Sequence, residues 1–218
     1  MVKSYVIRKG HFTDAQRKAY ESSAGKFIIP YKNEHINFHE VFGNSGEVTA
    51  EIGFGMGLAT ALIAESNPEK NYIGIEVHKP GVGRLLWEIE KRLLSNIRII
   101  EHDAADVMTQ MIMDNSLQAI HLFFPDPWPK KKHHKRRLVQ RPFTEVLAQK
   151  LCPGGYLYIV TDWGEYGEFA LRELSETKGL KNAYKDFAPP QKWRPETKFE
   201  KKGLEKSHEI KELFFVKE

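Results

Sequence analysis

Apolar and polar positions along this chain alternate in blocks that predict strands and helices in turn. Short runs rich in branched and aromatic residues predict five successive strands, Val48 to Ile52, Tyr72 to Glu76, Ile97 to Glu101, Ala119 to Phe124 and Tyr156 to Thr161. Between them, apolar residues recur at helical spacing, first in Val82, Leu85, Leu86, Ile89 and Leu93 and later in Phe143, Val146, Leu147 and Leu151. From position 47 to about 178 this alternation predicts an α/β fold, with a mostly parallel central sheet and helices on both faces.

The flanking segments have a different character. Residues 1–46 form a polar lead-in, and residues 179–218 contain a long polar stretch followed by a closing strand from Glu212 to Val216. Long loops in compact domains are usually functional or disordered. The aromatic residues Trp193 and Phe199 in this stretch indicate a loop that packs against the rest of the protein. Pro153-Gly154-Gly155 predicts a turn before the fifth strand. We expect a single domain over 1–218, with its core at 47–178.

Length and composition narrow the class of protein. The chain has 218 residues, of which 41% are hydrophobic, enough for one sizeable core but not for two. No apolar run is long enough to span a membrane, and the given N-terminus lacks the apolar stretch of a signal peptide, so we expect no membrane association and a cytoplasmic location. Cys152 is the only cysteine and is expected to be a buried apolar residue, and the absence of zinc-like Cys/His spacing predicts no metal.

Positive charge is concentrated in one short segment. The net charge is +4, and the run from Lys130 to Arg137 carries six Lys and Arg residues and no acid. Subtracting those six charges from +4 leaves −2 for the rest of the chain. Such a run is typical either of a solvated surface or of a patch that binds a polyanion such as RNA.

The most informative motif is the glycine turn from Gly53 to Gly57, placed between the first predicted strand and a helix that begins at Leu58. Glycine turns of this kind also occur for packing reasons alone. Here Glu51 precedes the turn, and Glu76 ends the second predicted strand. An acid before the glycines disfavours a pyrophosphate but suits a cationic ligand such as S-adenosylmethionine. Glu76 could then accept hydrogen bonds from the ribose hydroxyls of that ligand.

Further acids follow the later strands. The expected set at the carboxyl ends of the strands is Glu51, Glu76, Asp103, Asp126 and Asp162. Asp126 lies in the proline-rich segment 123–130, where three prolines fix the backbone around Asp126 and Trp128. A rigid carboxylate beside an aromatic ring could hold a flat base, although a stiff turn with Trp128 in the core is the alternative. The basic run begins at once after this segment.

Four motifs together, EIGFGMG, FPDPWPKKKHHKRR, TDW and RPETKFE, closely resemble the bacterial tRNA (guanine-N7-)-methyltransferase family. The resemblance extends from about Arg8 to Phe215. It implies a Rossmann-like class I methyltransferase fold that uses S-adenosylmethionine. It further implies methylation of N7 of a guanine in tRNA, at position 46 of the variable loop. Bacterial members are expected to need no separate protein partner, whereas the residues leave monomer and homodimer open.

The resemblance also implies roles for individual residues. Cofactor contacts are expected from Glu51, Gly53, Glu76, Asp103 and Asp126, with Asp126 also as the catalytic residue. Substrate contacts are expected from Lys130, Asp162, Thr197, Lys198, Phe199 and Glu200, and RNA contacts from Lys132, His133, His134, Lys135, Arg136 and Arg137.

Two rival functions stay open on the sequence alone. Asp-Pro-Trp after the fourth strand loosely resembles the motif of methyltransferases that act on exocyclic amino groups. A non-catalytic RNA-binding protein built on a degenerate methyltransferase fold is the second rival, although the complete set of acids argues against it. The methylated nucleoside distinguishes the first rival, and cofactor binding distinguishes the second.

Overall fold

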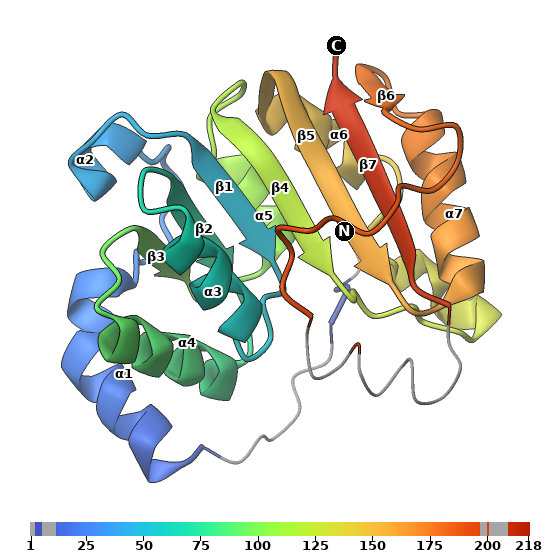
Figure 1. Ribbon diagram of the computed structural model, residues 1–218. Helices are drawn as coiled ribbons and strands as arrows, with labels where there is room; N and C mark the ends of the chain where they lie inside the picture. Colours follow the sequence, from blue (N-terminus) through green and yellow to red (C-terminus); the bar gives the residue numbers. More distant parts are fainter. Residues whose placement is uncertain (1–2, 6–11, 197–199, 201–208) are drawn as a thin grey trace. The chain divides into compact units, whose positions relative to one another are not determined.

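The computed structural model describes residues 3–5, 12–196, 200 and 209–218 of the chain (Figure 1). The described residues form two compact units. The N-terminal unit contains residues 12–113 and 193–195, and the C-terminal unit contains residues 3–5, 114–192, 196, 200 and 209–218.

The N-terminal unit is built on three parallel strands. Its elements are α1 (Asp14–Phe27), α2 (Phe38–Phe42), β1 (Val48–Ile52), α3 (Leu58–Ser66), β2 (Asn71–Ile75), α4 (Lys79–Arg92), β3 (Ile97–Ile100) and α5 (Ala104–Gln110). The strands lie in the order β3-β2-β1. Every residue of β1 and β2 is buried, as expected for parallel strands covered on both faces.

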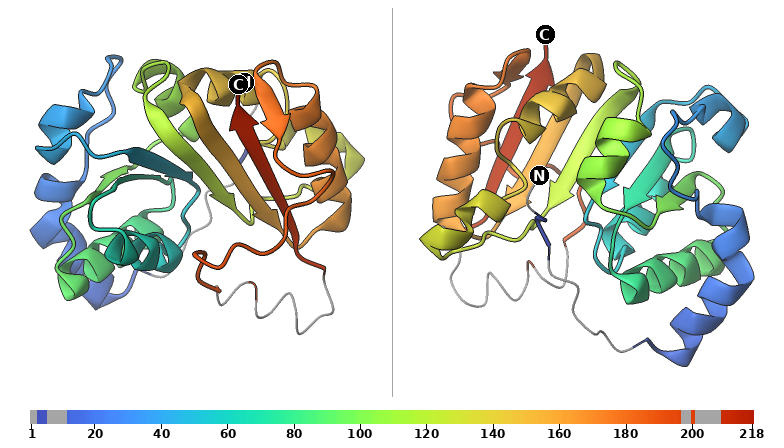
Figure 2. Two further views of the ribbon diagram at one scale, coloured as in Figure 1. Left: turned by 45° about the horizontal axis from the view of Figure 1, so that its top comes forward. Right: turned by 180° about the vertical axis from the view of Figure 1, so that it is seen from behind.

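Helices α1 and α4 lie side by side in this unit (Figure 2). Thr13 caps α1 through a reciprocal capping box with Gln16, which satisfies two N–H groups that the helix start leaves free. Two serines of α1, Ser22 and Ser23, donate hydrogen bonds to Glu90 on α4. The polar lead-in of the sequence therefore contains an ordered helix that packs on the predicted α/β core.

The C-terminal unit combines parallel and antiparallel strands. Its elements are β4 (Leu117–Phe123), the 3-10 helix η1 (Lys131–Arg136), α6 (Phe143–Lys150), β5 (Leu151–Thr161), α7 (Gly164–Ser175), β6 (Leu180–Asn182) and β7 (Lys211–Lys217). The order is β4-β5-β7-β6, in which β5 is parallel to β4 and antiparallel to β7. Helices α6 and α7 pack against these strands (Figure 1). The predicted α/β fold with a mostly parallel arrangement of strands is confirmed.

The segment Pro153-Gly154-Gly155 corrects one prediction. It was expected to form a turn before the fifth strand, but β5 already begins at Leu151 and contains the segment as an irregularity. The register shifts from Leu117↔Leu151 to Ala119↔Tyr156, so the glycines bulge out of the strand without ending it. Cys152 at this bulge is half-buried, not buried as expected, and its thiol donates to the carbonyl of Asn115 at 3.1 Å.

Among the residues that the structure describes, none of the helices combines the length and the apolar character required to cross a membrane.

Candidate functional site

The glycine turn connects β1 to α3 in the N-terminal unit. Gly53, Gly55 and Gly57 all have positive φ angles, +72°, +58° and +70°. At Gly57 a side chain would also clash, since an added Cβ would lie 2.7 Å from the Cβ of Leu85. Beside Gly53 and Gly55, by contrast, no described atom lies within 4 Å of an added Cβ. The turn is thus packed against α4 at Gly57 and at the carbonyl of Gly55, which faces Gly81, and it is open on the side to which a Cβ of Gly53 or Gly55 would point.

Glu76 follows β2 and is held by three backbone N–H groups. Its carboxylate accepts hydrogen bonds from Gly55 at 2.9 Å, Val77 at 2.7 Å and His78 at 3.0 Å. These bonds fix the carboxylate against the glycine turn before any ligand arrives. A carboxylate has about four acceptor sites, so Glu76 retains capacity for a hydroxyl donor.

Glu51 lies within β1 and is 4% exposed. The hydroxyl of Thr60, on α3, donates to its carboxylate at 2.8 Å. Burial raises the pKa of Glu51 to about 7, the bond from Thr60 opposes this, and the negative charge of Glu76 adds to it. Glu51 is therefore poised between its two charge states near neutral pH, and a cation bound beside it would favour the carboxylate.

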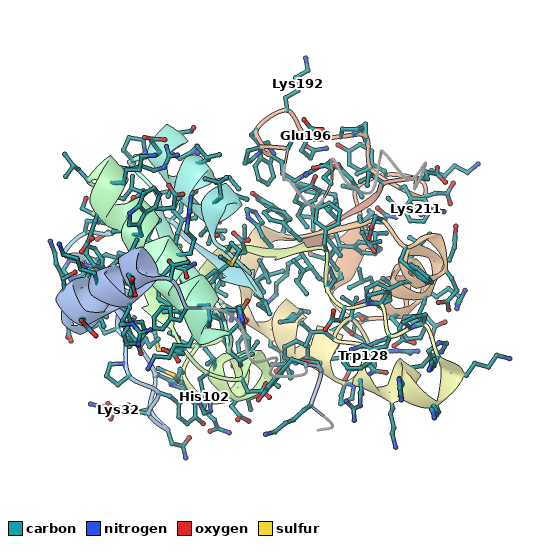
Figure 3. The ribbon with its side chains drawn as sticks, turned by 90° about the horizontal axis from the view of Figure 1, so that it is seen from below. Lys32, His102, Trp128, Lys192, Glu196 and Lys211 are labelled. Carbon is teal, nitrogen blue, oxygen red and sulfur yellow. The ribbon has the colours of Figure 1, made fainter. Side chains whose placement is uncertain are left out.

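Asp103 comes just after β3 and caps α5, because its carboxylate accepts the N–H of Ala105 at 2.8 Å. The preceding residue, His102, stacks on Tyr31 with 3.7 Å between the ring centroids (Figure 3 labels His102). Parallel strands end at one edge of a sheet, so the predicted group Glu51, Gly53, Glu76 and Asp103 belongs to the carboxyl-end region of one unit. Sequence reasoning missed Thr60, the partner of Glu51.

Asp126 is exposed in the C-terminal unit, in the loop after β4. Two bulky residues of this loop have left-handed backbone angles, Phe124 with φ +53° and Trp128 with φ +46°. Such angles are strained for large side chains and persist only where the surroundings hold them. One stabilising contact is a hydrogen bond from the indole N–H of Trp128, labelled in Figure 3, to the carbonyl of Ser4 at 3.0 Å.

Trp128 is half-buried. Its exposure lies between the two alternatives left open by the sequence, a ring available to a base and a ring buried in the core. The guanidinium of Arg136 lies 5.0 Å from its ring centroid, and the ring of His133 approaches edge-on at 5.8 Å. Its neighbours in the folded chain are therefore members of the basic run.

The basic run forms η1. Lys130, Lys131, Lys132 and Lys135 are exposed, whereas His133, His134 and Arg136 are half-buried. Partial desolvation, together with the positive charges of Lys132, Arg136 and further lysines of the run, lowers the pKa of His133. The short helix thus presents several exposed cationic side chains close together, as a polyanion-binding segment requires.

Arg137 differs from the rest of the run and from the prediction that it faces RNA. It is 1% exposed, and its guanidinium forms an ion pair with Glu165, in the first turn of α7. It also donates to the carbonyl of Pro127 at 3.0 Å. Sequence reasoning could not distinguish this buried arginine from the exposed cations before it, and it missed Glu165 altogether.

The remaining predicted substrate residues fall into two groups. Asp162 comes just after β5 and is half-buried, and Glu200 is 7% exposed. Since β4 and β5 are parallel, with Phe123 opposite Val160, Asp126 and Asp162 follow the same ends of neighbouring strands. Thr197, Lys198 and Phe199 lie outside the described residues.

Solved structures of methyltransferases share this fold. The 16S rRNA methyltransferase KamB matches with a TM-score of 0.62 and 16% identity, over 84% of this chain and 94% of that one. A protein of Streptococcus mutans titled "a putative methyltransferase", solved in complex with SAH, matches with a TM-score of 0.52 and 11% identity, over 80% and 90% of the two chains. These likenesses show the Rossmann-like class I methyltransferase fold.

Sequence relatives narrow this class. Residues 45–213 match the family described as "Putative methyltransferase". The tRNA (guanine-N(7)-)-methyltransferase of Nitrosomonas eutropha is 48% identical over 216 residues, which cover 99% of this chain and 96% of that protein. The chain belongs to the tRNA (guanine-N(7)-)-methyltransferase family.

Proposed function

We propose that this protein transfers the methyl group of S-adenosylmethionine to N7 of a guanine in tRNA, and that the guanine is at position 46 of the variable loop. The observation that carries the proposal is the continuity of Asp126, in its rigid loop after β4, with the cationic helix η1. One segment thereby supplies a carboxylate for a base and cations for the phosphates beside it. The 48% identity to the tRNA (guanine-N(7)-)-methyltransferase of Nitrosomonas eutropha, over nearly the full length of both chains, supports the same substrate.

The residues of the N-terminal unit fit the cofactor. Glu76, fixed by three backbone N–H groups, can accept a hydrogen bond from a ribose hydroxyl. Glu51 can stabilise a cationic centre, and Asp103 supplies a further acceptor after β3. The open side of the turn at Gly53 and Gly55 leaves room for the chain of the ligand. When bound, S-adenosylmethionine supplies a methyl group activated by a positively charged sulfur.

The reaction needs no strong base. N7 of guanine has an in-plane lone pair and no proton, so the N7–methyl bond forms as the sulfur–methyl bond breaks, giving S-adenosylhomocysteine and 7-methylguanosine. Carboxylates that accept from guanine N1–H and the 2-amino group stabilise the positive charge that develops on the purine. We assign this role to Asp126, with Asp162 and Glu200 as further acceptors. Alignment of the two reactants supplies much of the remaining decrease in activation free energy, up to about 7–11 kcal/mol.

The same acceptors account for base choice. Adenine also carries an N7 acceptor, so N7 alone cannot distinguish the two purines. The N1–H and 2-amino donors of guanine can distinguish it from adenine, because Asp126 and Asp162 accept hydrogen bonds and donate none when ionised. Lys130 and the segment Thr197 to Glu200 are assigned to the substrate by the family resemblance, and Lys132 to Arg136 to the RNA backbone. We further propose a cytoplasmic enzyme with one methyltransferase domain that acts without a separate protein partner, as a monomer or homodimer.

The test is a direct product analysis. Purified protein is incubated with methyl-labelled S-adenosylmethionine and an unmodified tRNA transcript, and the digested RNA is analysed by mass spectrometry. 7-Methylguanosine is expected, and an exocyclic methylated nucleoside would contradict the proposal. Borohydride and aniline cleavage at 7-methylguanosine then locates the site, and a transcript with adenine at position 46 serves as the control. Cleavage elsewhere would overturn the assignment to position 46.

A further inference from the structure

Arg137 is a buried cation whose hydrogen-bonding capacity is used inside the protein. One edge of its guanidinium pairs with both carboxylate oxygens of Glu165. Nε donates to the carbonyl of Pro127 at 3.0 Å, and a terminal nitrogen lies 3.1 Å from Nε2 of His134. The guanidinium also lies 4.6 Å from the ring centroid of Phe169. Glu165 responds to this pairing, since the hydrogen bond from Arg137 lowers its pKa.

The bond to Pro127 acts on the strained part of the loop. The carbonyl of Pro127 belongs to the peptide that precedes Trp128, and the orientation of that peptide sets the φ angle of Trp128, +46°. A bulky residue keeps such an angle only when other contacts enforce it. Arg137 supplies one of these contacts, on the residue next to Asp126.

The bond to Glu165 acts on the second acid. Glu165 lies in the first turn of α7, which begins two residues after Asp162. A single guanidinium therefore connects the loop of Asp126 to the start of the helix that follows Asp162. Planar, two-pronged pairing with a carboxylate fixes both direction and distance, which a lysine cannot do.

We propose that Arg137 is a positioning residue that sets the spacing of Asp126 and Asp162, and that it does not contact RNA. The proposal rests on the proposed function, because it concerns how the guanine edge is held. Release of Arg137 toward a phosphate would leave the carbonyl of Pro127 without this donor and Glu165 without its ion pair, and would break the packing of a side chain that is 1% exposed. Lys132 and Lys135 are already exposed and meet no such cost.

Two variants test the proposal together. Arg137→Lys keeps the charge and removes the planar fork. Glu165→Gln removes the partner's charge at a side chain that is 55% exposed, where loss of folding is not expected. In single-turnover methyl transfer at saturating tRNA, both are expected to be slower by about 10- to 100-fold, as for misplaced reactants. The Kd for tRNA and its salt dependence are expected to match those of the unaltered protein.

Arg141→Lys is the matched control. Arg141 also pairs with carboxylates of and just after α7, Glu173 and Glu176, but at the surface. Its conservative replacement should change neither rate nor affinity.

Two results would overturn the proposal. In the first, the variants bind tRNA more weakly with a flatter salt dependence and an unchanged saturated rate, which would make Arg137 a phosphate contact. In the second, rate and affinity both stay unchanged. If Arg137→Lys does not fold, Glu165→Gln alone decides. Failure of the unaltered protein to form 7-methylguanosine would instead contradict the proposed function, so the two failures are distinguishable.

Discussion

The glycine turn of the N-terminal unit and the basic helix η1 of the C-terminal unit hold their charges in opposite ways. Around the turn, Glu76 is fixed by three backbone N–H groups and Glu51 is buried against Thr60. Along η1, the lysines extend into solvent. A small ligand of constant shape suits a site built in advance from backbone groups. A long polyanion suits mobile cations, because counterion release does not require a unique geometry.

Arg137 marks the boundary of this contrast. It belongs to the basic run by sequence and to the prebuilt kind of site by structure, since it is buried and paired. Position within a charge run therefore does not define the role of a residue. The buried or hydrogen-bonded charges should affect chemistry or cofactor binding, and the exposed lysines of η1 should affect RNA affinity.

The largest expected effect concerns Asp126, the exposed acid that we assign to chemistry. Asp126→Asn keeps the shape of the side chain but removes the charge that stabilises the guanine cation. We expect the single-turnover rate to fall by about 100-fold or more, by analogy with the loss of one electrostatic contact to a transition state. Quench-flow measurement at saturating tRNA checks this. A full rate with unaltered tRNA affinity would remove Asp126 from the mechanism.

A somewhat smaller effect is expected at Glu76. Glu76→Gln places an amide where the backbone N–H groups of Gly55, Val77 and His78 need an acceptor. Loss of the charged acceptor for a ribose hydroxyl costs about 1.5–3 kcal/mol of binding free energy, so the Kd for S-adenosylmethionine should rise by about 10- to 100-fold. Calorimetry measures it, and tRNA affinity without cofactor is the control. If tRNA binding weakens equally, the change is general misfolding.

Glu51 sharpens the comparison through pH. Its pKa is raised to about 7, and only the carboxylate attracts a cation, so binding of S-adenosylmethionine should release a proton and strengthen as pH rises through 7. We expect an increase in affinity of up to about tenfold between pH 6 and pH 8. Glu51→Gln should remove this pH dependence. Calorimetry in buffers of different ionisation enthalpy reports the released proton, and its absence would contradict the assignment.

The smallest effect is expected on η1. Lys135→Gln removes one exposed cation and should weaken tRNA binding by a few-fold, with a salt slope lower by about one unit per lost phosphate contact. Filter binding at several salt concentrations measures the slope. Lys181→Gln, an exposed lysine after α7, is the control and should leave the slope unchanged. An unchanged slope in Lys135→Gln would make η1 a solvated surface.

Much of the fold could be predicted from the sequence because parallel strands are continuous apolar runs. Val48 to Ile52 matches β1 fully, and the other predicted strands overlap β2 to β5 and β7 with shifted ends. Strand ends were less accurate because a polar residue such as Glu101 can lie just beyond the last ladder bond. Helix α1 was missed because few apolar positions mark its buried side.

The acids of the candidate site could be named from the sequence, whereas the residues that hold them in place could not. Acids after strands are visible in a sequence, since strand ends and acids can both be read directly. Thr60 and Glu165 are ordinary helix residues whose importance depends on what lies beside them in space. The burial of Arg137 likewise depends on α7, which is distant in the sequence. Local pattern contains none of this information.

The bulge in β5 limits how the length of this protein can change. Between two paired positions β4 advances by two residues while β5 advances by five, from Leu151 to Tyr156. Removing one residue here would slide the rest of β5 along its neighbours by about 3.3 Å and turn each of its side chains to the opposite face. Asp162, which follows the strand, would move with it. We therefore expect a deletion within 152–155 to be poorly tolerated.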